Sequence, residues 1–174
     1  EMLARAAGLE WIVTSTEGIT CCKDGEFFTY PAAENKALSM IQAIAEDRWG
    51  NLWIGSFTNG FTCLHNGKFT TYTTKQGLPG NQVRFIYQDD NRDLWVAASA
   101  GIVKLSKPGV FQTYAPHDLL PYLKTACLYE TGTGELWIGT GDGGLFKLKN
   151  GKATACETRA EVMSAVTPSR MIFS

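Results

Sequence analysis

The sequence predicts an all-β protein, and two observations carry this prediction. Tryptophan recurs at a constant spacing of 42 residues, at Trp11, Trp53, Trp95 and Trp137. Within each period, short apolar runs rich in β-branched and aromatic residues alternate with turn clusters such as "RWGN", "HNGK" and "LPGN". No segment keeps helical spacing of apolar residues over a dozen positions. The stretch "EDRWGNLWIGSFTNGF" is therefore one copy of a repeat and not a unique site.

Other columns share the same period when the four units are aligned on tryptophan. They contain Phe27, Phe69 and Phe111, then Tyr30, Tyr72 and Tyr114, and upstream Ile44, Ile86 and Leu128. The fourth unit departs, with Ala153 and Cys156 in the two aromatic columns. In the third unit Arg92 stands where its siblings have glycine, and the third strand begins one residue earlier.

Four antiparallel strands per unit, repeated radially, predict a β-propeller. Each blade of a propeller is covered on both faces, which explains the continuous apolar runs "LWIG" and "LWVAA". The tryptophan on the second strand supplies apolar area between blades. We expect one propeller segment of about four blades, with units at 1–38, 39–80, 81–122 and 123–160 and a closing or next-blade strand in 161–174.

Three ways of completing such a ring remain open. The chain closes on itself with four blades, two copies form eight blades, or the chain is a piece of a longer propeller. Uncovered blade faces promote association. We expect a partial or half propeller that forms a homo-oligomer or is completed by the rest of a longer propeller.

Composition excludes several classes of protein. The 174 residues carry a net charge of −1 without a basic stripe, so we expect no nucleic-acid partner and no direct membrane contact. No apolar run approaches the roughly 20 residues that span a bilayer, and the first ten residues lack the pattern of a signal peptide. Five cysteines without C-x-x-C spacing and two histidines predict no metal site, and no cofactor is expected.

Two motifs look chemical but are better explained as turns. "GTGDGG" at 139–144 lies between strands, whereas a dinucleotide fingerprint opens a helix. Asp89, Asn91 and Asp93 have the spacing of a calcium loop, but Leu94 replaces the required glycine. No nucleophile elbow or metal-spaced histidine pair is present. We expect no catalytic residues and no enzyme.

Ligand sites favour concave mouths with converging polar groups. In a propeller, one end of the channel is ringed by the turns between second and third strands and by the connections between blades. Here that face would collect candidate ligand-binding residues Phe57, Asn59, Asn81, Arg84, His117, Asp118 and Asp142.

The stretch "GNLWIG…GKFTTYTTKQGLPGNQVRFIYQDD" resembles the two-component-regulator propeller repeat. The resemblance runs from about Gly8 to Cys156 and implies a periplasmic or extracellular sensor region of a bacterial signalling protein. It implies recognition of a small-molecule or protein ligand without catalysis. The alternative is an interaction scaffold that assembles with another propeller half; a propeller lyase or glycosidase-like enzyme is the third.

Overall fold

The computed structural model describes residues 2–6, 9–14, 17–116, 125–131, 135–140, 144–149 and 152–156. These residues form four antiparallel sheets, each built from four strands consecutive in the chain. We number the sheets blades 1 to 4.

Blade 1 comprises β1 (Met2–Ala6), β2 (Leu9–Thr14), β3 (Gly18–Lys23) and β4 (Glu26–Pro31). Blade 2 comprises β5 (Ile41–Glu46), β6 (Leu52–Ser56), β7 (Gly60–His65) and β8 (Lys68–Tyr72). Blade 3 comprises β9 (Val83–Gln88), β10 (Leu94–Ala98), β11 (Gly101–Lys107) and β12 (Val110–Pro116). Blade 4 comprises β13 (Thr125–Glu130), β14 (Leu136–Thr140), β15 (Leu145–Lys149) and β16 (Lys152–Ala155).

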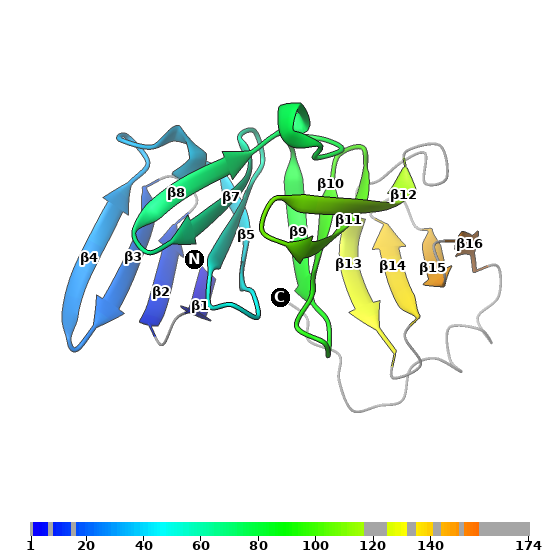
Figure 1. Ribbon diagram of the computed structural model, residues 1–174, viewed down its shortest axis with the longest axis horizontal. Helices are drawn as coiled ribbons and strands as arrows, with labels where there is room; N and C mark the ends of the chain where they lie inside the picture. The colour runs from blue at the N-terminus through cyan, green and yellow to red at the C-terminus, as the bar shows by residue number, and fades with distance from the viewer. Residues whose placement is uncertain are drawn as a thin grey trace.

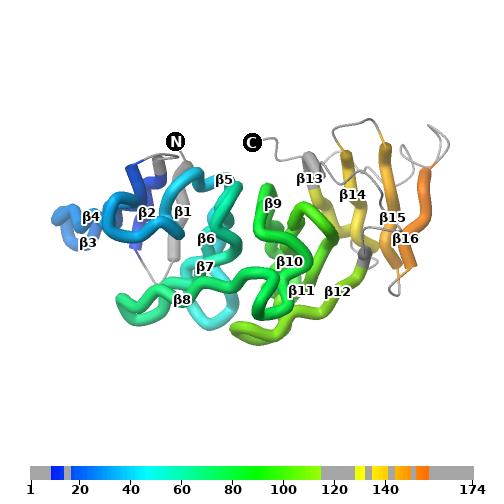
Figure 2. The backbone as a smooth tube through the Cα atoms, turned by 90° about the horizontal axis from the view of Figure 1, so that it is seen from above, coloured from blue at the N-terminus to red at the C-terminus, as the bar shows by residue number. Residues whose placement is uncertain are grey.

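The blades stand side by side along the chain (Figure 1). Figure 2 shows them fanned into an open arc, with the first strand of each blade on the concave side and the fourth at the rim. Neighbouring first strands contact one another in the order β1, β5, β9, β13. The predicted partial propeller is confirmed, and the sheets do not close into a ring. Helical structure in the described residues amounts to two single 3-10 turns, η1 (Lys36–Leu38) and η2 (Thr74–Gln76).

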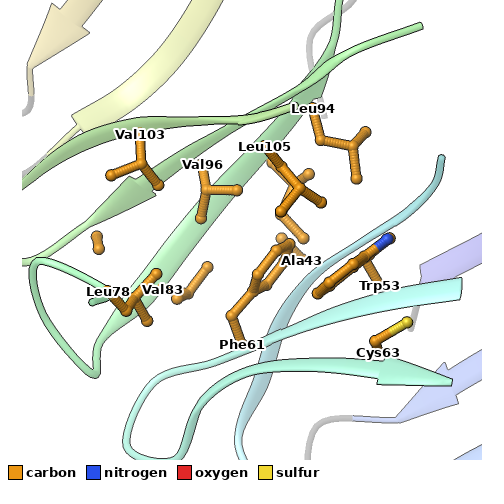
Figure 3. Close-up of a cluster of buried hydrophobic side chains, with 12 residues drawn as sticks. Ala43, Trp53, Phe61, Cys63, Leu78, Val83, Leu94, Val96, Val103 and Leu105 are labelled. Atoms are coloured by element: carbon orange, nitrogen blue, oxygen red, sulfur yellow. The ribbon is translucent and has the colours of Figure 1, made fainter. Parts of the chain in front are cut away.

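The second strand of each blade is apolar because its two faces pack against different neighbours. In β6, Leu52 and Ile54 belong to the buried cluster shared with blade 1. Trp53, between them in sequence, belongs to the cluster shared with blade 3. Side chains alternate between faces along a strand, so each successive residue is buried against a different blade. Figure 3 shows Trp53 and Phe61 of blade 2 facing Val96 and Leu105 of blade 3.

Glycine at the start of the third strand has a steric cause. Gly60 has φ +85°, and a Cβ there would lie 2.3 Å from the carbonyl oxygen of Tyr72. Only glycine fits such a position without displacing the neighbouring strand. In blade 3 the corresponding strand β11 begins at Gly101, one residue earlier relative to tryptophan, as the sequence predicts.

The Tyr and Phe columns form edge-to-face pairs between blades. Tyr30 of blade 1 meets Phe69 of blade 2 at 5.3 Å between ring centroids and 79° between planes. Tyr72 of blade 2 meets Phe111 of blade 3 at 5.5 Å and 77°. Such T-shaped pairs add to the stabilisation that area burial provides. In each case the phenylalanine faces the preceding blade.

Candidate functional site

We call the end formed by residues 36–40, 57–59, 73–82 and 99–100 the mouth end. It contains the turns between second and third strands and the connections between blades. Phe57, Asn59 and Asn81 lie at this end, and Arg84 lies near the beginning of β9, next to it. The other predicted site residues, His117, Asp118 and Asp142, fall outside the described residues.

Asn59 holds the connection between blades 1 and 2. Its side-chain amide donates to the carbonyl oxygen of Lys36 at 2.8 Å and to Oγ of Ser39 at 3.0 Å. Ser56 supports the same contact, because its hydroxyl donates to the carbonyl oxygen of Ser39 at 2.8 Å. The Asn59 amide nitrogen is thus engaged within the protein.

Asn81 stabilises the connection between blades 2 and 3 in a similar way. Its Oδ1 accepts from the backbone N–H of Thr74 at 2.9 Å, and its carbonyl oxygen accepts from the N–H of Gly60 at 2.9 Å. The adjacent Gly80 lies so close to the β10–β11 turn that a Cβ would fall 2.2 Å from Oγ of Ser99. Asn81 therefore fixes the course of the connection.

Arg84 differs from both asparagines, because it sits at an irregularity in the innermost strand. Ala98 pairs with Val83 and Ala97 with Phe85, which leaves Arg84 as an extra residue in β9. Such bulges redirect a side chain and are frequent next to binding sites. The Arg84 guanidinium carbon lies 5.1 Å from the ring centroid of Phe57, so two predicted site residues are brought into contact.

The bulge recurs at the same column in neighbouring blades. In β5 the pairing jumps from Ile41 to Ala43, leaving Gln42, and in β13 it jumps from Thr125 to Cys127, leaving Ala126. Gln42 is exposed on the inner strand next to β9. The sequence-based site omitted Gln42, although the 42-residue period that relates it to Arg84 was a sufficient signal.

Met40 is a second mouth-end residue that sequence reasoning missed. Its φ is 52°, in the left-handed region that long side chains avoid. Its carbonyl oxygen accepts from the N–H of Phe57 at 2.9 Å, which ties the strained residue to the mouth-end turn. The side chain is 45% exposed. No sequence pattern signals such a backbone conformation at methionine.

The opposite end, formed by residues 47–51 and 89–93, is built for stability. Asp47 is 1% exposed and accepts from the Trp53 indole N–H at 2.7 Å. Asp89 accepts from the Trp95 indole at 3.1 Å and pairs with Nζ of Lys104 at 2.9 Å. These carboxylates are structural, and the predicted explanation of the Asp89 segment as a turn is confirmed.

Charges at this end are also paired between blades. Arg48 of blade 2 forms an ion pair with Asp93 of blade 3 and donates to the carbonyl oxygen of Asn91 at 2.8 Å. Its guanidinium carbon lies 5.5 Å from the ring centroid of Trp49. Arg48 with Trp49 thus repeats the arrangement of Arg84 with Phe57, but with a carboxylate added.

The Cys63 thiol is buried and is not an activated nucleophile. Burial, and then the negative charge of Asp47, raises the pKa of the Cys63 thiol to about 12, so this sulfur stays protonated and unreactive at neutral pH. Cys21, Cys22 and Cys63 are free thiols. In the described ranges no group of three His, Cys, Asp or Glu side chains is placed to hold a metal ion.

Comparison with known proteins identifies the repeat. The family described as "Two component regulator propeller" matches residues 37–58 and 77–100. Both segments are similar to the propeller repeat of that family. They include Met40, Gln42 and Phe57 in the first segment and Arg84 in the second. No curated protein matches the chain significantly.

Solved structures with the same fold include extracellular domains of signalling proteins. The domain of BT3049, described as a hybrid two component system of B. thetaiotaomicron, is 23% identical with a TM-score of 0.65, over 86% of this chain and 20% of that one. The corresponding domain of BT4673 is 18% identical with a TM-score of 0.69, over 89% of this chain and 24% of that one.

An enzyme shares the propeller fold as well. Virginiamycin B lyase from Staphylococcus aureus is 17% identical with a TM-score of 0.66, over 90% of this chain and 55% of the lyase. The repeat-containing chain thus spans between a fifth and about half of the length of these structures. At this level of identity the likeness concerns the fold. Within the described residues, no helix has the length and apolar character to span a membrane.

Proposed function

We propose that this chain is a non-catalytic sensor segment of a bacterial signal-transduction protein, placed in the periplasm or outside the cell. It binds a small-molecule or protein ligand at the mouth end. The observation that carries the proposal is the match to two-component-regulator propeller repeats over 37–58 and 77–100. The extracellular domains of two hybrid two-component systems, which have the same fold, support the location.

The contrast between the two ends of the arc supports ligand binding at the mouth end. At the opposite end Arg48 and Trp49 are also exposed, but the carboxylates are paired within the protein: Asp47 and Asp89 accept from tryptophan indoles, and Asp93 pairs with Arg48. At the mouth end Phe57, Met40 and Arg84 are partly or largely accessible. Exposed apolar and charged groups on a rigid scaffold are typical of recognition surfaces.

The proposal is tested by thermal unfolding in the presence of a panel of sugars, amino acids and organic acids. A ligand that binds the folded state stabilises it in a saturable way, by about 2.7 kcal/mol at a hundredfold excess over Kd. We expect the shift in Tm to vanish in Phe57→Ala and to persist in Arg48→Gln at the opposite end. A ligand whose effect depends on Arg48 and not on Phe57 would overturn the proposed location.

A specific observation favours a second candidate function, an interaction scaffold. Phe27 on β4 is 67% exposed, although its counterparts Phe69 and Phe111 pack on the preceding blade. A second copy or another propeller half that covers Phe27 would bury this face. Sedimentation velocity over a range of concentrations tests this: a scaffold associates, and Phe27→Lys prevents association. A concentration-independent monomer would count against self-assembly.

A further inference from the structure

We infer that the mouth end between blades 2 and 3 binds a small anionic ligand with an apolar part, with Arg84 facing the negative charge and Met40 and Phe57 facing the apolar part. The inference rests on the proposed ligand-binding function and adds the chemical class of the ligand. It starts from a comparison of two arginines. Both Arg84 and Arg48 lie over an aromatic ring, at 5.1 Å and 5.5 Å from its centroid.

Among the described residues, a carboxylate neutralises only one of these arginines. Arg48 pairs with the carboxylate of Asp93 and donates to the Asn91 carbonyl. In the described part of the chain, Arg84 has no carboxylate partner, although it is half-buried. An arginine presents five donors in a planar fork that matches carboxylate or sulfate oxygens two at a time. The guanidinium lies beside Phe57 and is partly exposed.

The backbone sets where this charge is presented. The bulge in β9 makes Arg84 the unpaired residue of the innermost strand, and the same bulge in β5 presents Gln42. β5 and β9 are neighbours on the concave side of the arc (Figure 2). The Gln42 amide donates to the carbonyl oxygen of Ile41 at 3.4 Å, so this neighbour on the inner strand carries no charge to compete with Arg84. In blade 4 the bulge position is occupied by Ala126. Of the three bulge positions in blades 2 to 4, only that of blade 3 therefore carries a positive charge.

Met40, which supplies the apolar side, has a left-handed backbone conformation that long side chains avoid. Its column-mate in blade 3, Gln82, lacks the positive φ that Met40 has. The turn holds Met40 through the Phe57 N–H, and Thr58 Oγ1 lies 4.0 Å from the Met40 sulfur. Strained backbone of this kind tends to be retained where it positions a side chain for function. A methionine thioether adapts to flat or irregular apolar groups.

Together these groups fit a carboxylate or sulfate attached directly to an apolar or aromatic body. A neutral molecule of the same shape would contact Met40 and Phe57 but would not form an ion pair with Arg84. A cation would be repelled. The net charge of the whole chain is −1, so general attraction of anions does not explain such a preference.

Ligand-observed NMR with three matched probes tests the inference: phenylacetate, phenylacetamide and phenethylamine. We expect saturable binding of phenylacetate, at least about tenfold weaker binding of phenylacetamide, which corresponds to about 1.4 kcal/mol, and none of the amine. Arg84→Gln should remove the preference for the acid over the amide. Arg48→Gln, the matched control at the opposite end, should retain it.

Met40→Gly separates the effect on stability from the effect on ligand binding. Glycine relieves the left-handed backbone, so we expect an unchanged or higher Tm together with weaker binding of both phenyl probes. An unchanged acid-to-amide ratio in Arg84→Gln, or absence of phenylacetate binding, would overturn the inference. Either result would leave the proposed function intact if another ligand still required Phe57 for binding. The proposed function would be overturned, independently of the ligand class, if ligands bound at the opposite end.

Discussion

Two buried aspartates connect a turn to the aromatic core in the middle blades. Asp47 and Asp89 stand at the same position of the repeat, six residues before tryptophan, and each accepts from the indole N–H of that tryptophan. In blade 4 the column holds Thr131. There the buried Nε1 of Trp137 has no hydrogen-bond partner within the part of the chain that the structure describes. A buried donor without an acceptor costs free energy.

Thr131→Asp should therefore stabilise blade 4. An aspartate at this position reaches the Trp137 indole as Asp47 reaches Trp53, and we expect the free energy of unfolding to rise by about 1 kcal/mol. Urea denaturation measures the change. Thr131→Asn separates the hydrogen bond from the added charge, because its amide oxygen also accepts. Lower stability in both variants would contradict the explanation.

The pKa values of Glu130 and Glu135 are shifted in opposite directions, which predicts opposite dependences of stability on pH. Burial and then the charge of Asp89 raise the pKa of Glu130, whereas hydrogen bonds from Lys149 and Lys147 lower the pKa of Glu135. A raised carboxyl pKa means that the folded state binds the proton more tightly than the unfolded state, so stability falls as pH rises through that pKa. A lowered pKa gives stability that is present near neutral pH and lost on acidification.

Accordingly, Glu130→Gln should stabilise the protein near neutral pH, and its advantage should shrink as the pH falls toward the ordinary glutamate pKa of about 4.3. Glu135→Gln should be less stable than the native protein near neutral pH, with the difference shrinking in acid. Unfolding free energies measured across this range test both. Parallel curves for native protein and variants would show that neither carboxyl group contributes to the pH dependence.

At the scale of the element, the second strands must let the next blade approach. In β6 the face that carries Trp53 continues with Gly55, and a Cβ at Gly55 would lie 2.5 Å from Cγ1 of Val83 on β9. Ile86 Cδ1 lies 3.5 Å from the same point. The inner strand of blade 3 therefore packs directly against the backbone of β6.

Gly55→Ala should force blades 2 and 3 apart and lower the free energy of unfolding by about 1–3 kcal/mol, as overpacking of a core does. The double variant Gly55→Ala, Val83→Ala removes the clashing methyl groups, and we expect it to be less destabilised than the sum of its single variants. Denaturation of the four proteins measures this coupling. Additive effects would mean that the two residues do not meet as described.

At the scale of the whole molecule, each blade turns one apolar face toward its predecessor. In blade 2 that face carries Leu52, Ile54, Leu64 and Phe69, all buried or partly buried against blade 1. The same columns of blade 1 hold Glu10, Ile12, Cys22 and Phe27. The arc leaves these positions without a covering blade among the described residues, and Phe27 is accordingly exposed.

The Phe column gives a matched pair of substitutions. Phe27→Lys should change the free energy of unfolding by no more than about 0.5 kcal/mol, because the ring is already in water. Phe69→Lys should destabilise by about 2 kcal/mol or more, because it removes the pair with Tyr30 and buries a charge. Urea denaturation at low protein concentration compares them. Equal losses would mean that the face carrying Phe27 is covered in solution.

Much of the candidate site could be anticipated and some of it could not. Arg84 and Phe57 were both predicted at the mouth end, since the turns of a propeller repeat map to one end. Their contact, 5.1 Å from charge to ring, needed the structure. Asn59 and Asn81 were also predicted there, but their side chains hold the connections between blades. Met40 was missed because no residue pattern signals a strained φ, whereas Gln42 could have been found from the 42-residue period that relates it to Arg84.

The sequence by itself determined the strand content, the blade repeat and the position of tryptophan between blades. Periodicity records which faces are buried, and burial against two neighbours makes strands apolar throughout. Only the tertiary structure decided the open arc, the pairing of Arg48 with Asp93 and the contact of Arg84 with Phe57. These features depend on distances between residues of neighbouring blades, which blade curvature and bulges set. A pattern of residue types read along the chain carries no such distances.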